Sequence, residues 1–188
     1  ITQIMFAATF AGAMLWLDKR LAMFQQILMG PFRRWEYILS KLVSIMIQGL
    51  LNALLVFVIA SPLLIGLKVT FTSVLYIAGS LILGALFFGS LTLLISVFIK
   101  SNEAFNALLN VMFTPLMFLS SVYYPIEGAP LIIRAASMAN PLTYAANMLR
   151  AGLLGVYTST LPLEIMVLTV ESLVMFFAAT VAFRKVKA

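Results

Sequence analysis

Long apolar stretches alternate along the chain with short polar or basic segments. A stretch of about 20 apolar residues forms a helix long enough to cross the hydrocarbon core of a bilayer. On this basis the sequence predicts five transmembrane helices, at residues 1–17, 42–67, 73–99, 104–120 and 162–183. We therefore expect an all-α polytopic membrane protein with a single transmembrane domain over residues 1–188. Because the sequence is already apolar at Ile1 and does not start with Met, we also expect a truncated N-terminus and a sixth span upstream.

Two of the predicted spans carry polar side chains at four-residue spacing, which places them on one face of a helix. These residues are Ser44, Gln48 and Asn52 in the second span and Asn106, Asn110 and Thr114 in the fourth. In a membrane helix such a stripe faces another helix or a water-filled path. Two interpretations stay open: hydrogen bonding between helices, or the lining of a translocation path.

The third and the last predicted spans each carry a further signal. In the third, Ser80 with Gly84 and Ala85 with Gly89 are pairs of small residues that permit close approach of a neighbouring helix. The last span contains Glu171 near mid-bilayer, where a carboxyl group is costly. It is either a neutral or hydrogen-bonded acid at a helix interface or a functional group, for example in proton coupling.

The segment 18–41 joins the first two predicted spans and holds five of the twelve Lys and Arg residues. Leu21, Phe24 and Leu28 recur at helical spacing, which predicts a short amphipathic helix. Asp18 is its expected N-cap, and Gly30 followed by Pro31 is expected to end it and to let the next helix begin. Either this helix transmits movement to a partner outside the bilayer, or the segment is a charged loop lying on lipid headgroups.

The segment 121–159 is too apolar for a free loop and too interrupted by proline for one straight span. Its prolines predict two short helices, near residues 130–139 and 141–149. We expect them to form an outer hairpin that enters the outer leaflet and returns without crossing it. The alternative is a loop that lies on the lipid without a gating role. The residues assigned to the hairpin are Tyr123, Tyr124, Pro125, Pro130, Asn140, Pro141, Tyr144 and Arg150.

Composition excludes several classes of function. The chain is 63% hydrophobic and 10% charged, with a mean hydropathy of +1.11, so it is not a soluble domain. Its net charge of +6 suits anionic lipid headgroups rather than nucleic acid. The absence of Cys and His removes thiol chemistry, zinc sites and a Ser-His-Asp triad, and there is no GxxxxGK[ST] or GxGxxG phosphate cradle. We expect a membrane protein that is not itself an enzyme and binds no ATP.

The distribution of basic residues predicts the orientation of the chain. Nine Lys and Arg residues fall in the segment 18–41, at Lys100 and in the C-terminal tail, and three fall on the opposite side. Because basic loops stay in the cytoplasm, the nine mark the cytoplasmic side. The C-terminus is then cytoplasmic, and Ile1 lies toward the outside.

Two of these stretches resemble one family, the membrane subunits of ABC-2 type ABC transporters. The first match is a cytoplasmic pattern of charged residues, a hydrophobic helix, a Pro and then basic residues: Asp18, Lys19, Leu28, Pro31, Arg33, Arg34 and Lys41. The second is the family's outer hairpin: Ser120-Ser121-Val122-Tyr123-Tyr124-Pro125, Pro130, Asn140-Pro141-Leu142-Thr143-Tyr144 and Arg150. The sequence departs from the pattern at three positions. Gln25 and Gln26 stand where family members often have an acidic residue, and Ser121 stands where Gly is common.

The resemblance implies the permease half of an ATP-driven exporter in the plasma membrane, which moves a drug, a lipid or a lipid-linked glycan. It implies a homo- or heterodimer of permease subunits and two cytoplasmic ATPase subunits, which bind ATP and Mg; this chain holds no cofactor. The residues implied to contact the ATPase are Asp18, Lys19, Arg20, Leu21, Phe24, Gln25, Leu28, Gly30, Pro31, Arg33, Arg34 and Glu36. The alternatives are an ion- or proton-coupled transporter that uses Glu171 and a scaffold that transports nothing.

Overall fold

The computed structural model describes residues 1–20, 34–60, 70–99, 101–123 and 128–184. Within these ranges the chain forms seven α-helices and no strand, which confirms the all-α prediction. The helices are α1 (Thr2–Arg20), α3 (Arg34–Ala60), α4 (Phe71–Phe98), α5 (Asn102–Phe118), α6 (Leu131–Met138), α7 (Pro141–Leu154) and α8 (Leu161–Arg184).

Three of these helices are long and apolar enough to cross a membrane, judged by length and composition: α3, α4 and α8. The other two that fall on predicted spans, α1 and α5, have 19 and 17 residues and do not meet the same criterion. At a rise of about 1.5 Å per residue, α5 is roughly 25 Å long, shorter than a hydrocarbon core of about 30 Å. The count of five spans therefore stays a prediction.

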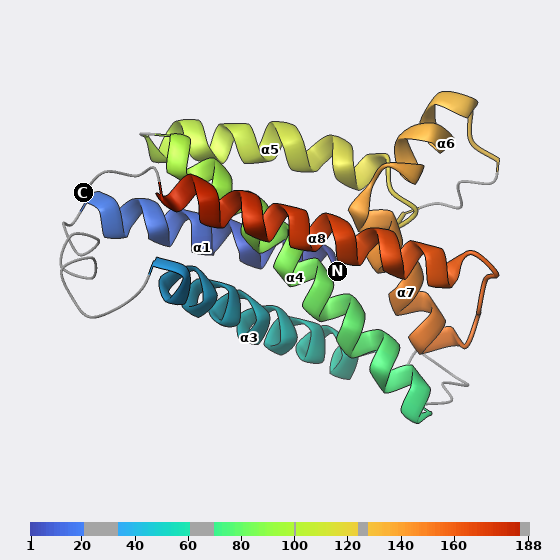
Figure 1. The fold of residues 1–188 in the computed structure, drawn as a ribbon. Helices are drawn as coiled ribbons and strands as arrows, with labels where there is room; N and C mark the ends of the chain where they lie inside the picture. Colours follow the sequence, from blue (N-terminus) through green and yellow to red (C-terminus); the bar gives the residue numbers. More distant parts are fainter. Residues whose placement is uncertain (21–33, 61–69, 100, 124–127, 185–188) are drawn as a thin grey trace.

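Helix α4 is the centre of the bundle and packs against α1, α3, α7 and α8 (Figure 1). The end of α1, the start of α3 and the end of α8 lie at one end of the bundle, at the left of Figure 1. The start of α4, the start of α8 and the helices α6 and α7 lie at the other. The helix ends that border residues 21–33 therefore lie at the opposite end of the bundle from α6 and α7. The orientation of the two ends in the membrane stays a prediction.

Large side chains from five helices fill the core. Ile4 and Met5 of α1, Ile38 and Leu42 of α3, Phe88 of α4, Phe105 of α5 and Phe183 of α8 are almost fully buried. The ring of Phe88 packs edge-on against Phe113 of α5, with ring centres 5.9 Å apart. This aromatic contact joins α5 to α4, and edge-to-face pairs are favourable beyond the area that they bury.

Small residues bring α4 close to its neighbours, as the sequence predicted. Ser80, Gly84, Ala85 and Gly89 are all buried. A Cβ atom built on Gly89 would lie 2.7 Å from Leu42 Cδ2 of α3, so a larger residue would require that side chain to move.

One predicted boundary in the segment 18–41 is wrong. Asp18 does not start a new helix, because α1 continues through it to Arg20. At the other side α3 begins at Arg34, three residues after Pro31, where the next helix was expected to begin. Glu36 lies in its first turn, where a carboxylate suits the positive end of the helix dipole.

Candidate functional site

The outer face of α5 carries the polar stripe that the sequence predicted. Asn106, Asn110 and Thr114 are all exposed, whereas Phe105 and Leu109 on a neighbouring face of the helix are buried. The stripe thus points away from the core of its own chain. This arrangement leaves two amides and a hydroxyl on an open helix surface for groups outside this chain.

The exposed surface of α5 is polar on one side and apolar on the other. Val111 is 70% exposed and Phe118 is 62% exposed, and they flank the polar stripe on the same helix. The amide of Asn106 donates to the carbonyl of Asn102 at 2.9 Å, which satisfies part of its hydrogen bonding within the helix. Such a surface suits a partner that is mainly apolar but carries some polar groups.

The second polar stripe lies on α3. Ser44 and Gln48 are exposed and Asn52 is half-buried, while the Ser44 hydroxyl donates to the carbonyl of Ser40 at 2.9 Å. Figure 1 shows α3 and α5 on opposite sides of the bundle. The two stripes therefore do not meet within one chain.

Glu171 lies in α8 and is half-buried. Its Oε2 atom is buried and has no hydrogen-bond partner among the described residues. Burial raises the pKa of Tyr144, and the charges of Glu171 and Glu164 raise it further. Within the described ranges no three acidic side chains come together as a metal site would require.

The outer hairpin contains the two short helices that the prolines predicted, α6 and α7, although α7 continues to Leu154. Asn140 caps α7: its side-chain oxygen accepts from the amide of Leu142 at 3.0 Å, and Pro141 takes the first helical position. The other half of the same amide donates to the Leu116 carbonyl of α5 at 2.7 Å. One side chain thus starts α7 and binds the end of α5.

Arg150 of α7 connects the hairpin to the residues that follow α5. Its guanidinium donates to the backbone carbonyls of Ser121 and Val122. It also donates to the side-chain oxygen of Asn147, at 3.3 Å. The amide of Asn147 in turn donates to Glu164 of α8 at 3.0 Å.

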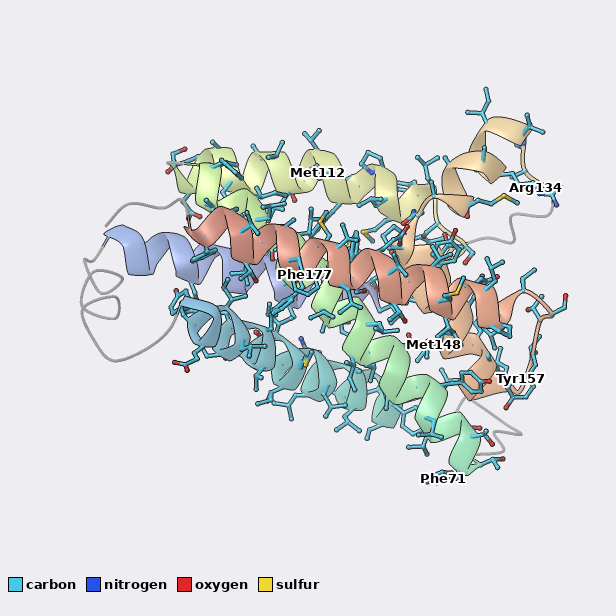
Figure 2. The ribbon with its side chains drawn as sticks, viewed as in Figure 1. Phe71, Met112, Arg134, Met148, Tyr157 and Phe177 are labelled. Carbon is cyan, nitrogen blue, oxygen red and sulfur yellow. The ribbon has the colours of Figure 1, made fainter. Side chains whose placement is uncertain are left out.

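The remaining described residues assigned to the hairpin are Tyr123, Pro130 and Tyr144. Tyr123 is exposed and its ring lies 6.4 Å from that of Phe118. The hydroxyl of Tyr144 donates to the carbonyl of Met138. Pro130 immediately precedes α6, and Figure 2 shows Arg134 of that helix at the periphery of the molecule. Tyr124 and Pro125 lie outside the described residues. Entry of the hairpin into a leaflet stays a prediction.

Most of the segment assigned to an ATPase contact also lies outside the described residues: Leu21, Phe24, Gln25, Leu28, Gly30, Pro31 and Arg33. Asp18, Lys19 and Arg20 belong to the last turn of α1, while Arg34 and Glu36 belong to the first turn of α3. These two helix ends lie on the same side of the bundle (Figure 1). The proposed role of the segment is therefore untested by the geometry.

Sequence reasoning did not find Asn147 and Glu164, which complete the hydrogen-bond network of the hairpin. One signal was available, because Asn147 precedes Arg150 by three residues and so shares its face of α7. Glu164 offered no such signal, since its contact joins two different helices.

The chain is similar to a known protein family and to a known protein. Residues 1–154 match the family model of the ABC-2 type transporter. Nodulation protein J of Rhizobium leguminosarum bv. trifolii is 25% identical over 113 residues, which cover 60% of this chain and 43% of that protein. The chain thus matches less than half the length of this relative.

Proposed function

Because the chain belongs to the ABC-2 type transporter family, we propose that it is the permease subunit of an ATP-driven exporter in the cell membrane. A permease of this type is a multi-pass transport protein that leaves ATP hydrolysis to separate ABC ATPase subunits. ATP and Mg are then bound by those subunits, and this chain carries the translocation path. The family match covers α1 to α7 and so includes both the helix bundle and the hairpin.

The observation that carries this proposal is the outward polar stripe of α5, formed by Asn106, Asn110 and Thr114. Amides and hydroxyls are costly in hydrocarbon, so a stripe of them on a membrane helix needs a polar or protein-lined surrounding. A second permease subunit, identical or related, provides this when its own α5 faces the first across a shared path. The substrate then moves between the two subunits.

The chemistry of this surface suits a hydrophobic or amphipathic substrate. The stripe offers hydrogen bonds from neutral groups, and Val111 and Phe118 beside it offer apolar contact. A drug, a lipid or a lipid-linked glycan combines these two requirements.

The energy for transport comes from ATP hydrolysis by the ATPase, which we place against residues 18–36. The apolar side chains of Phe24 and Leu28 are the expected anchors, since buried aromatic and aliphatic groups contribute most of the energy of an interface. Membership of the ABC-2 family favours ATP hydrolysis as the energy source over an ion-coupled mechanism at Glu171. In the ATP-driven complex the carboxyl of Glu171 is a structural group between α8 and α7.

Co-purification with a candidate ABC ATPase tests the proposal. Phe24→Asp is expected to reduce recovery of the complex by tenfold or more, because loss of a central anchor costs about 2 kcal/mol or more. Phe71→Asp is the matched control: the same change at the 78% exposed first residue of α4, at the opposite end of the bundle. Hydrolysis of ATP by the purified chain alone, or equal loss of complex in both variants, would contradict the proposal.

A further inference from the structure

We propose that Asn140, Asn147 and Arg150, here called the α7 clamp, are positioning residues that hold the outer end of α5 and thereby set the opening of the outer mouth of the path. The clamp itself follows from the hydrogen bonds of the hairpin, whereas its effect on a path rests on the proposed function. The residues touch no substrate in this proposal and act through α5.

The end of α5 needs partners from outside the helix. The last carbonyls of a helix lack intrahelical donors, and a buried carbonyl without a partner is unfavourable. Leu119 N–H bonds to the carbonyl of Pro115, and Ser120 N–H bonds to that of Met117. The carbonyl between them, that of Leu116, receives the amide of Asn140 at 2.7 Å.

Arg150 secures the turn that follows. Its guanidinium donates to the carbonyls of Ser121 and Val122, which lie shortly after the end of α5 at Phe118. A cation near the end of α5 is also favoured by the negative end of the helix dipole. A planar guanidinium with several fixed donors can bind two carbonyls at once, which a lysine ammonium does less well.

The clamp is anchored on the far side by α8. The side-chain oxygen of Asn147 accepts from the Ser121 hydroxyl at 3.0 Å, and its amide donates to Glu164 at 3.0 Å. Thr160 donates to the other oxygen of Glu164 at 2.9 Å. A continuous series of hydrogen bonds therefore runs from the end of α5 through α7 to the start of α8.

The position of α5 depends on these bonds because the rest of the helix has limited packing. Only the row of Phe105, Leu109 and Phe113 is buried, and most of the other side chains of α5 are half-buried or exposed. The buried row fixes the helix along its length, whereas the clamp fixes its outer end. Release of the clamp therefore frees the end that carries Thr114 and Phe118 without detaching the helix.

Distances between spin labels test the clamp directly, because the chain has no native cysteine. One label pair joins Phe118→Cys of α5 to Val170→Cys of α8, and a second pair at the other end joins Leu108→Cys to Val181→Cys; all four positions are exposed. Labelled chain is diluted with unlabelled chain in lipid nanodiscs. Arg150→Met is expected to broaden and shift the first distance distribution and to leave the second unchanged. Arg150→Lys is expected to give an intermediate result.

Arg134→Met is the matched control, because it removes the same charge from an exposed site in the same hairpin. If Arg150→Met fails to fold, Asn140→Ala removes one bond to α5 and should produce a smaller shift in the same direction. A first distribution that is the same in Arg150→Met or Asn140→Ala as in the parent would overturn the clamp. A change in both distributions would also overturn it, since the structure would then have changed at both ends and not at the outer end of α5 alone.

A second measurement tests the effect on the outer mouth. A membrane-impermeant thiol reagent is applied to cells that express the chain with its ATPase partner and with Thr114→Cys as the single cysteine. Arg150→Met is expected to speed labelling several-fold, and Arg134→Met to leave the rate unchanged. Equal rates with altered distances would show that the clamp does not control the mouth. Failure of the proposed function appears separately, as a chain that forms no complex with an ATPase.

Discussion

Gly152 offers a direct test of the packing between α7 and α4. A Cβ atom built on Gly152 would lie 2.9 Å from the carbonyl oxygen of Ser73 and 3.2 Å from the amide nitrogen of Ile77, both backbone atoms of α4. Backbone atoms cannot rotate away as a side chain can, so Gly152→Ala forces the two helices apart. Overpacking of this kind costs about 1–3 kcal/mol.

A second effect acts in the opposite direction. Alanine is more favourable than glycine inside a helix by about 0.5–1 kcal/mol, and Gly152 lies within α7. The steric cost exceeds this gain over most of its range. From the middle of each range we expect Gly152→Ala to lower the free energy of unfolding by about 1 kcal/mol.

Thermal or denaturant unfolding of the purified chain in detergent measures this difference. Gly128→Ala is the matched control, because a Cβ atom at Gly128 would have no neighbour within 4 Å. We expect the control to change the free energy of unfolding by less than about 0.5 kcal/mol. If Gly152→Ala is as stable as the parent, α4 and α7 do not pack this closely and the geometry of the hairpin is wrong.

Three further predictions use the same chain. Ser80→Ala removes the 2.7 Å hydrogen bond from the buried Ser80 hydroxyl to the carbonyl of Ala145, and should cost about 0.5–1.5 kcal/mol in the same unfolding assay. An impermeant thiol reagent on intact cells should label Gly128→Cys and miss Ala188→Cys; labelling of the latter would reverse the predicted orientation. We expect Glu171→Gln to leave ATP-driven transport active, with at most partial loss. Abolished transport with full ATP hydrolysis would instead favour proton coupling.

The apolar stretches predicted the positions of two candidate membrane helices closely. The third stretch, 73–99, corresponds to α4 at Phe71–Phe98, and the last, 162–183, corresponds to α8 at Leu161–Arg184. Hydropathy alone did not predict the start of α3, which lies before the apolar stretch 42–67; the Gly30-Pro31 pair came closer. Arg34 and Glu36 are charged and yet helical, because a helix can continue beyond an apolar stretch.

Local motifs predicted the hairpin better than its contacts. Asn140 followed by Pro141 is a helix start that can be read from sequence, and the structure has this cap. The partner of Asn140 on α5 is 24 residues away and that of Asn147 on α8 is 17 residues away. No periodicity relates residues on different helices, so these pairs required the fold.

The spacing of Asn106, Asn110 and Thr114 predicted a polar face but not the direction in which it points. Had the stripe faced α4, hydrogen bonding within the bundle would have accounted for it. It is exposed instead, on a helix whose neighbouring face is buried by Phe105 and Leu109. If α5 crosses the membrane as predicted, amide groups on this face need protein, water or a polar substrate beside them, because lipid cannot satisfy them. The exposure of the whole stripe, more than its spacing, is what makes α5 a candidate for the lining of a path between two subunits.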